Sequence, residues 1–154
     1  MTQRIDYAQV APEGLAGIVG IERHVKSSGL ERSLVHLVKA RASQINGCAY
    51  CIDMHTKDAR AGGETEQRLY ALAAWRETPF FTERERAALA WTEALTTIAD
   101  GGVPDGVYEA TRAHFGERDL VDLTLAIVAI NGWNRLAVAF RTPVGDYDPT
   151  SASV

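Results

Sequence analysis

The sequence has little of the clustered basic charge that nucleic-acid-binding proteins use. Acidic residues outnumber basic ones, and the formal net charge is −4 at pH 7. Lys and Arg alternate with Glu and Asp along most of the chain. Because phosphate backbones and anionic membrane surfaces are bound mainly through grouped cationic side chains, this composition argues against both. We therefore expect no nucleic-acid partner and no membrane partner.

Long apolar runs are also scarce. No uninterrupted run approaches the roughly 18 residues of a membrane-spanning helix, and the first seven residues lack the apolar core of a signal peptide. The glycine pairs Gly62-Gly63 and Gly101-Gly102 are isolated, so no phosphate-binding loop is present, and no nucleophile-elbow serine motif occurs. These absences predict a cytoplasmic protein that is neither a nucleotide-binding protein nor a serine hydrolase.

Cysteine is rare: the 154 residues contain two. A chain of this length can bury a core without a covalent cross-link, and structural disulfides are uncommon in the cytosol. The two cysteines, Cys48 and Cys51, stand three residues apart. A Cys-x-x-Cys pair in this setting indicates redox chemistry or metal binding.

Alternation of apolar and polar residues with the period of a β-strand is missing, whereas helical spacing is frequent. The sequence predicts an all-α, single-domain helical bundle of about six or seven helices over residues 1–154. Its core covers about 12–142, and a C-terminal tail covers 143–154. The expected helices span about 12–28, 31–46, 48–61, 65–75, 82–100, 104–115 and 117–140.

The last expected helix is apolar over much of its circumference. One small bundle needs a single apolar stripe per helix, so the excess predicts association with further copies of the chain. Asn131-Gly132 is a possible kink, and we interpret Asn134 as part of that kink or of an interface. Residues 2–12 are expected to be extended.

Cys48, Cys51 and His55 follow one another at positions i, i+3 and i+7. In a helix these three side chains share one face close to its N-terminus. The reactive form of cysteine is the thiolate, which a helix N-terminus and a nearby histidine both favour. The spacing therefore predicts an activated dithiol, and the helix dipole favours Cys48 as the thiol with the lower pKa.

The segment RASQINGCAYCIDMH, from Arg41 to His55, resembles the core motif of the AhpD-like alkylhydroperoxidases of the carboxymuconolactone decarboxylase superfamily. The similarity continues to Glu64 and returns weakly at Asn131–Arg135. The resemblance implies an all-α protein that forms trimers or hexamers. It also implies a thiol peroxidase or disulfide reductase that uses no metal or haem. Its substrate would be a hydroperoxide or a disulfide, and its electron donor a thiol or a lipoyl-type dithiol.

The resemblance further implies that Cys48 and Cys51 cycle between dithiol and disulfide, with His55 as base and proton relay. It favours Cys51 as the peroxide-reactive thiol and Cys48 as the resolving one, and we adopt this order. Members of the family carry a glutamate twelve residues before the first cysteine, where this sequence has His36. An imidazole can relay a proton but supplies no fixed negative charge. The expected catalytic residues are Cys48, Cys51, His55 and His36.

Three other interpretations remain open on the sequence. The protein could carry disulfides without useful peroxidase activity. Cys48, Cys51, His55 and His36 could instead bind zinc, although their spacing is not that of a zinc finger. The thiols could also be inert small apolar groups in the core. The favoured prediction is an antioxidant oxidoreductase with no cofactor beyond the Cys48–Cys51 disulfide.

Overall fold

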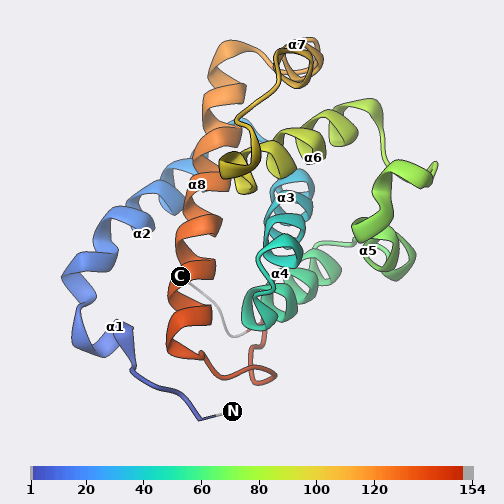
Figure 1. Ribbon diagram of the computed structural model, residues 1–154. Helices are drawn as coiled ribbons and strands as arrows, with labels where there is room; N and C mark the ends of the chain where they lie inside the picture. The colour runs from blue at the N-terminus through green and yellow to red at the C-terminus, as the bar shows by residue number, and fades with distance from the viewer. Residues whose placement is uncertain (1, 151–154) are drawn as a thin grey trace.

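The computed structural model describes residues 2–150, and within this range it is helical throughout, without a strand (Figure 1). The expected all-α fold is confirmed. Eight α-helices and two 3-10 helices follow one another in the order α1 Tyr7–Val10, α2 Pro12–Ser27, α3 Arg32–Ile45, α4 Ala49–Ala61, α5 Glu66–Ala71, η1 Leu72–Glu77, α6 Glu83–Thr96, η2 Ile98–Asp100, α7 Asp105–Arg112 and α8 Glu117–Phe140.

Two local details differ from expectation. The segment before Pro12 is not fully extended, because the Asp6 side chain accepts hydrogen bonds from the N–H groups of Ala8 and Gln9 and so starts α1. The expected helix over 65–75 changes from α5 to the 3-10 helix η1 at Leu72, and Ala74, inside η1, has a non-helical backbone.

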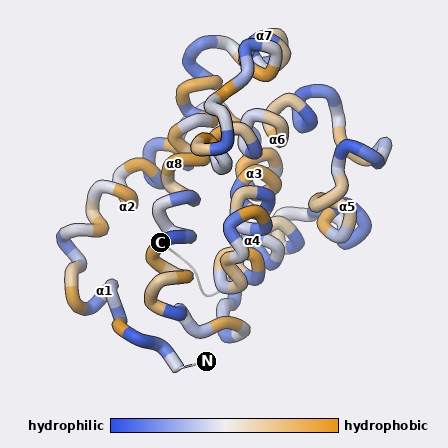
Figure 2. Tube along the Cα trace, viewed as in Figure 1, coloured by the Kyte–Doolittle hydropathy of each residue, from blue (hydrophilic) through white to orange (hydrophobic). Residues whose placement is uncertain are grey.

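Helices α3 and α8 form the centre of the molecule (Figure 1). Helix α3 packs against α4, α6 and α8, while α2 packs along α8. Figure 2 shows apolar residues along both central helices. Their fully buried side chains include Leu37, Val38, Leu123, Ile127 and Ile130. The cysteine-bearing α4 is thereby held against both central helices.

The apolar composition of helix α8 has a structural explanation. By length and composition it could cross a membrane, although no uninterrupted apolar run is that long. Packing within the chain explains part of this apolar character: α8 is the core helix, and α2, α3, α4, α6 and α7 all contact it. It also buries two polar residues, Asp122 and Asn134.

Helix α8 continues through Asn131 and Gly132, where the sequence offers a possible kink, so these residues do not end the helix. A Cβ atom at Gly132 would lie 3.2 Å from Cδ1 of Ile18 in α2. The glycine therefore permits the close approach of two helices, and it does not end one.

The described part of the tail, 143–150, returns to α4 of the same chain. Lys57 Nζ donates to the carbonyl oxygens of Gly145 and Tyr147, at 2.9 and 3.0 Å. The Tyr147 hydroxyl donates to Asp58 Oδ1 at 2.6 Å. These contacts fix residues 145–147 beside the helix that carries Cys51, and residues 151–154 of the expected tail lie outside the described range.

Candidate active site

A tight turn after α3 places the first cysteine. Gly47 has φ +63°, in the left-handed region that glycine adopts at low cost. The Cys48 N–H then donates to the Ser43 carbonyl at 3.0 Å, and Cys48 becomes the N-cap residue of α4. The helix therefore starts at Ala49, one residue later than expected. Both cysteines are free thiols and each is 1% exposed.

The two thiols form a close, asymmetric pair. A hydrogen bond from the Cys51 thiol lowers the pKa of Cys48 to about 7, even though burial opposes this, and the N–H groups of Cys51 and Tyr50 contribute to the lowering. The same hydrogen bond, with burial, raises the pKa of Cys51 well above its usual range. The helix N-terminus thus favours the Cys48 thiolate, in the direction that the helix dipole predicts.

Asn134 of α8 lies beside the two thiols, a position that the sequence did not predict. It is 1% exposed, donates to Ser43 Oγ at 3.1 Å, and accepts from the Asn46 side chain at 2.9 Å. Its side chain also lowers the pKa of both thiols by hydrogen bonding. A motif of neighbouring residues cannot predict this contact, because it joins α8 to the α3–α4 turn, which is distant in the sequence.

A cavity of about 320 Å³ lies beside the second cysteine. Cys51 lines it and Cys48 does not. His55, one helical turn further along α4, lines the same cavity. The remaining wall comes from four other helices and from α4 itself: Tyr7, Glu22, Lys39, Tyr50, Met54, Trp133 and Ala137. Cys51 is therefore the thiol that a small molecule in this cavity can reach.

His55 is 5% exposed, and neither ring nitrogen has a hydrogen-bond partner among the described residues. Burial lowers the pKa of His55, although Asp58 opposes this. The ring is therefore neutral near pH 7 and holds one nitrogen that can accept a proton.

His36 does not line the cavity of Cys51. It lines a separate cavity of about 470 Å³ together with Asp58 and Tyr147. Burial lowers the pKa of His36 to about 4, and its Nδ1 atom is buried without a hydrogen-bond partner. The potential ligand atoms of His36, His55 and Asp58 lie within 4.8 Å of one another, and this group contains neither cysteine. Among the described residues, the four side chains of the hypothetical zinc set are not gathered as one such group.

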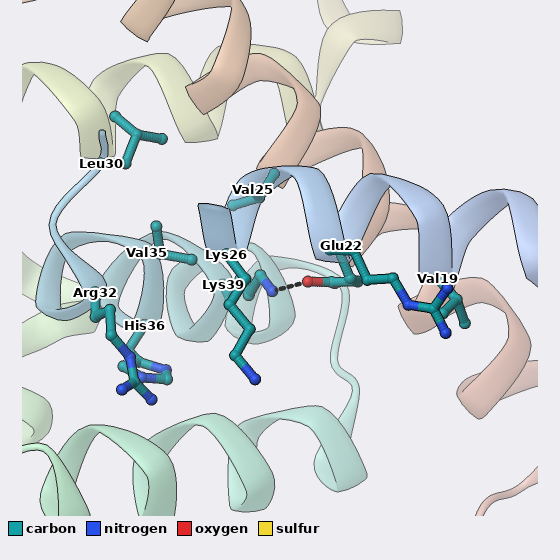
Figure 3. A pocket seen from close by; sticks show the side chains of 10 residues that line it. Val19, Glu22, Val25, Lys26, Leu30, Arg32, Val35, His36 and Lys39 are labelled. Carbon is teal, nitrogen blue, oxygen red and sulfur yellow. Dashed lines mark hydrogen bonds and ion pairs between the residues drawn. The ribbon is translucent and has the colours of Figure 1, made fainter. Parts of the chain in front are cut away.

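A partly buried ion pair supplies charge that the sequence did not predict. Lys39 of α3 is 7% exposed and pairs with Glu22 of α2 (Figure 3). Both residues line the cavity of Cys51 and His55, and both also line a neighbouring cavity of about 340 Å³. Two carboxylates are thus present near His55, Asp58 of α4 and Glu22 of α2, and neither comes from position 36. The sequence signal that could have indicated this pair is Lys39, a charged residue among the mostly apolar buried residues of α3.

Comparison with known proteins places this arrangement in a family. The sequence model of the carboxymuconolactone decarboxylase family matches residues 12–94. The chain is 48% identical over 139 residues to the uncharacterized protein YdfG of Bacillus subtilis, covering 90% of this chain and 95% of that protein. It is 31% identical over 117 residues to the uncharacterized protein YnjA of Escherichia coli, covering 76% and 62%.

Solved structures agree with the fold. A protein of unknown function from Agrobacterium tumefaciens, described provisionally as the antioxidant defence protein AhpD, superposes with a TM-score of 0.91 at 48% identity, covering 95% of this chain and 100% of that one. The debrominase Bmp8 superposes with a TM-score of 0.80 at 18% identity, covering 90% and 74%. An AhpD-core protein of Ralstonia eutropha gives 0.78 at 20%, with the same coverages. At 18% and 20% identity, the similarity to Bmp8 and to the Ralstonia eutropha protein shows only a shared fold.

Proposed function

Because the chain belongs to the carboxymuconolactone decarboxylase family, we propose that it is a thiol-dependent oxidoreductase that reduces hydroperoxides through a Cys48–Cys51 dithiol/disulfide cycle. One observation carries the proposal: Cys51 and a neutral, unpartnered His55 line one cavity, while Cys48 is hydrogen-bonded to Cys51 outside it. The relative from Agrobacterium tumefaciens, with its provisional description as AhpD, supports the same class of activity.

In the first step, His55 takes the Cys51 proton as the sulfur attacks the terminal oxygen of the hydroperoxide. The O–O bond breaks, a sulfenic acid forms on Cys51, and the alcohol leaves with the proton that His55 returns. The raised pKa of Cys51 makes this base necessary. The Lys39 ammonium in the cavity wall stabilises the negative charge that develops on the leaving oxygen.

In the second step, the Cys48 thiolate attacks the sulfenic sulfur. An S–S bond forms, and the hydroxyl group leaves as water after protonation. In the reduced pair Cys48 has a pKa of about 7 and is substantially ionised at neutral pH, so the resolving thiolate is already present when Cys51 is oxidised. An external dithiol of the lipoyl type then reduces the disulfide, and its own two thiols become a disulfide.

Glu22 replaces the missing carboxylate at position 36 in this scheme. Asp58 and, more weakly, Glu22 favour the protonated form of His55, so both stabilise the imidazolium that exists between the two proton transfers. The Glu22–Lys39 pair thereby serves both the base and the leaving oxygen. His36 lines a different cavity, and it influences His55 from the side on which Asp58 lies.

The direct test is hydroperoxide consumption with dihydrolipoamide as donor, compared among wild type, Cys51→Ser and Cys48→Ser. We expect turnover only in wild type, and a dimedone-trapped sulfenic acid on Cys51 in the Cys48→Ser variant. A sulfenic acid found only on Cys48 of the Cys51→Ser variant would reverse the order of attack. A pair that cycles reversibly against a redox buffer without consuming peroxide would make the protein a disulfide carrier.

The proposal places the protein in the cytoplasm, where dithiol donors keep such a pair reduced.

The proposal also includes assembly into homo-oligomers. Val121 and Val128, two helical turns apart on α8, are more than half exposed and offer an apolar surface for a second copy.

A further inference from the structure

We propose that His36, His55 and Asp58 form a binding site for a divalent transition-metal ion of the zinc class, and that its occupation switches off the thiol pair. The site joins α3 to α4 and contains no cysteine. Binding of the metal goes beyond the proposed function, whereas the switching rests on it. Two neutral imidazoles and one carboxylate are a ligand set that Zn²⁺ and its neighbours favour.

The three side chains are already close to ligand geometry. Their potential ligand atoms lie within 4.8 Å of one another, and His55 Nδ1 lies 3.8 Å from Asp58 Oδ2. Ligand atoms about 2.0–2.1 Å from a tetrahedral zinc ion lie about 3.3 Å apart. Small side-chain rotations therefore suffice, because His55 and Asp58 sit one turn apart on α4.

Unpartnered nitrogen atoms are the second, independent observation. His36 Nδ1 and both ring nitrogens of His55 are buried and make no hydrogen bond to the described residues. Buried polar atoms in folded proteins nearly always have a partner, and an isolated one costs stability. A metal ion between the two rings would satisfy a nitrogen of each.

The surroundings orient the carboxylate and leave one coordination position open. The Tyr147 hydroxyl donates to Asp58 Oδ1 at 2.6 Å, which leaves Oδ2 for the metal. Such outer hydrogen bonds are usual around metal ligands. The cavity of about 470 Å³ on this side admits a fourth ligand, and Arg32 in its wall favours an anionic one such as hydroxide or a carboxylate.

Occupation of this site withdraws His55 from catalysis. The nitrogen nearest Asp58 is Nδ1. With Nδ1 on the metal, Nε2 carries the remaining proton and cannot accept another from Cys51. The metal-bound protein then holds a Cys51 thiol with no base in its cavity. The metal acts here as an inhibitor and takes no part in the redox cycle.

The binding test uses the purified full-length chain with Zn²⁺ in competition with a chromogenic chelator, and Co²⁺ as a spectroscopic probe. We expect one ion per chain. Tetrahedral d–d bands should appear in the Co²⁺ spectrum without the thiolate charge-transfer band that a cysteine ligand produces. His36→Gln and Asp58→Asn should weaken binding by more than the roughly 10–100-fold typical of outer partners, and Tyr147→Phe by about that amount.

Matched controls separate this site from the thiols. Asp53→Asn removes another carboxylate of α4, one that accepts from Lys57, and should leave the affinity unchanged. Cys48→Ser/Cys51→Ser should keep full affinity while losing all redox activity, so a failure of the proposed function does not hide the metal site. Circular dichroism confirms that each variant is folded. Unchanged affinity in both His36→Gln and Asp58→Asn, or loss of affinity in the double cysteine variant, would overturn the proposed site.

The switching test compares peroxide consumption with and without stoichiometric Zn²⁺. Inhibition should occur in wild type and be relieved by a chelator, and Asp58→Asn should require at least about tenfold more Zn²⁺ for the same effect. Equal inhibition of wild type and Asp58→Asn would place the inhibiting metal on the thiols and overturn the switch.

Discussion

At the residue scale, the structure separates the two cysteines by acidity and by access, and the two criteria select different residues. Cys48 has the lowered pKa, while Cys51 lines the cavity. A low pKa alone does not make the first nucleophile when the sulfur cannot be reached. This division matches a cycle in which the accessible thiol needs a base and the acidic thiol resolves.

The first prediction concerns titration of this pair. Thiolate absorbance in the ultraviolet should rise with pH near 7 for one thiol, because the Cys51 hydrogen bond lowers the pKa of Cys48, and the other thiol should stay protonated well into the alkaline range. In Cys51→Ala the hydrogen-bond donor is gone, so the Cys48 transition should move upward toward an ordinary thiol. An unchanged transition in that variant would show that the helix N-terminus alone sets the acidity.

The second prediction concerns the Glu22–Lys39 pair. Lys39→Met leaves Glu22 without its partner in a partly buried site, and we expect a loss of roughly 1–3 kcal/mol in the free energy of unfolding, below the value for a fully buried pair. Adding Glu22→Gln should recover most of the stability, since no unpaired charge remains. Urea denaturation of the four proteins of this double-mutant cycle measures the coupling.

The same cycle tests catalysis. Peroxide consumption should remain low in the double variant even where stability is recovered, because both charges near His55 are then missing. Recovery of turnover together with stability would mean that the pair is structural only.

Residue-scale prediction from the sequence identified the four local candidates but not their long-range partners. Cys48, Cys51 and His55 follow one another along α4, so helical periodicity is enough to relate them. Asn134 and Glu22 reach the site from α8 and α2, and only the packing of those helices brings them there. The sequence also singles out His36, but the closeness of His36 to His55 and Asp58 could not be predicted from spacing.

At the scale of elements, three helices begin at side-chain caps, α1 at Asp6, α5 at Thr65 and α6 at Thr82. The capping box at Thr82 and Glu85 and the N-cap at Thr65 are both present, as their sequence patterns predict. The misses have local causes: Asp6 starts an extra helix, and Ala74 interrupts another. Neither residue carries a strong sequence signal, since aspartate also favours loops and alanine favours helices.

The third prediction concerns the α3–α4 turn. Gly47 has φ +63° and a Cβ there would meet nothing within 4 Å, so any cost of substitution comes from the backbone alone. Gly47→Ala should lower the free energy of unfolding by about 1 kcal/mol, and Gly47→Asn by less, because asparagine tolerates this conformation better. Chemical denaturation measures both, and equal stability of all three proteins would contradict the argument.

At the scale of the whole molecule, the apolar character of α8 has two sources. Its inner side is the core of the chain, with Leu123, Ile127 and Ile130 fully buried. Its outer side exposes Val121, Val128 and Val138, which the fold of one chain leaves uncovered. The sequence shows that α8 has more apolar residues than one stripe needs, but it does not show which of them face the core and which face the surface. The reason is that a 24-residue helix that contacts five others has no single apolar stripe.

The last prediction tests whether this outer side binds a second copy. Wild type should be larger than a monomer by light scattering at micromolar concentration. Val128→Glu should shift it toward the monomer, because a carboxylate in an apolar interface loses its hydration. Glu83→Lys, a charge change at the exposed start of α6, is the matched control and should leave the mass unchanged. Circular dichroism distinguishes dissociation from unfolding, and a folded monomeric Val128→Glu variant would identify α8 as the interface. A variant that remains oligomeric would mean that the interface lies on another face. A monomeric wild type would mean that the valines are simply solvent-exposed.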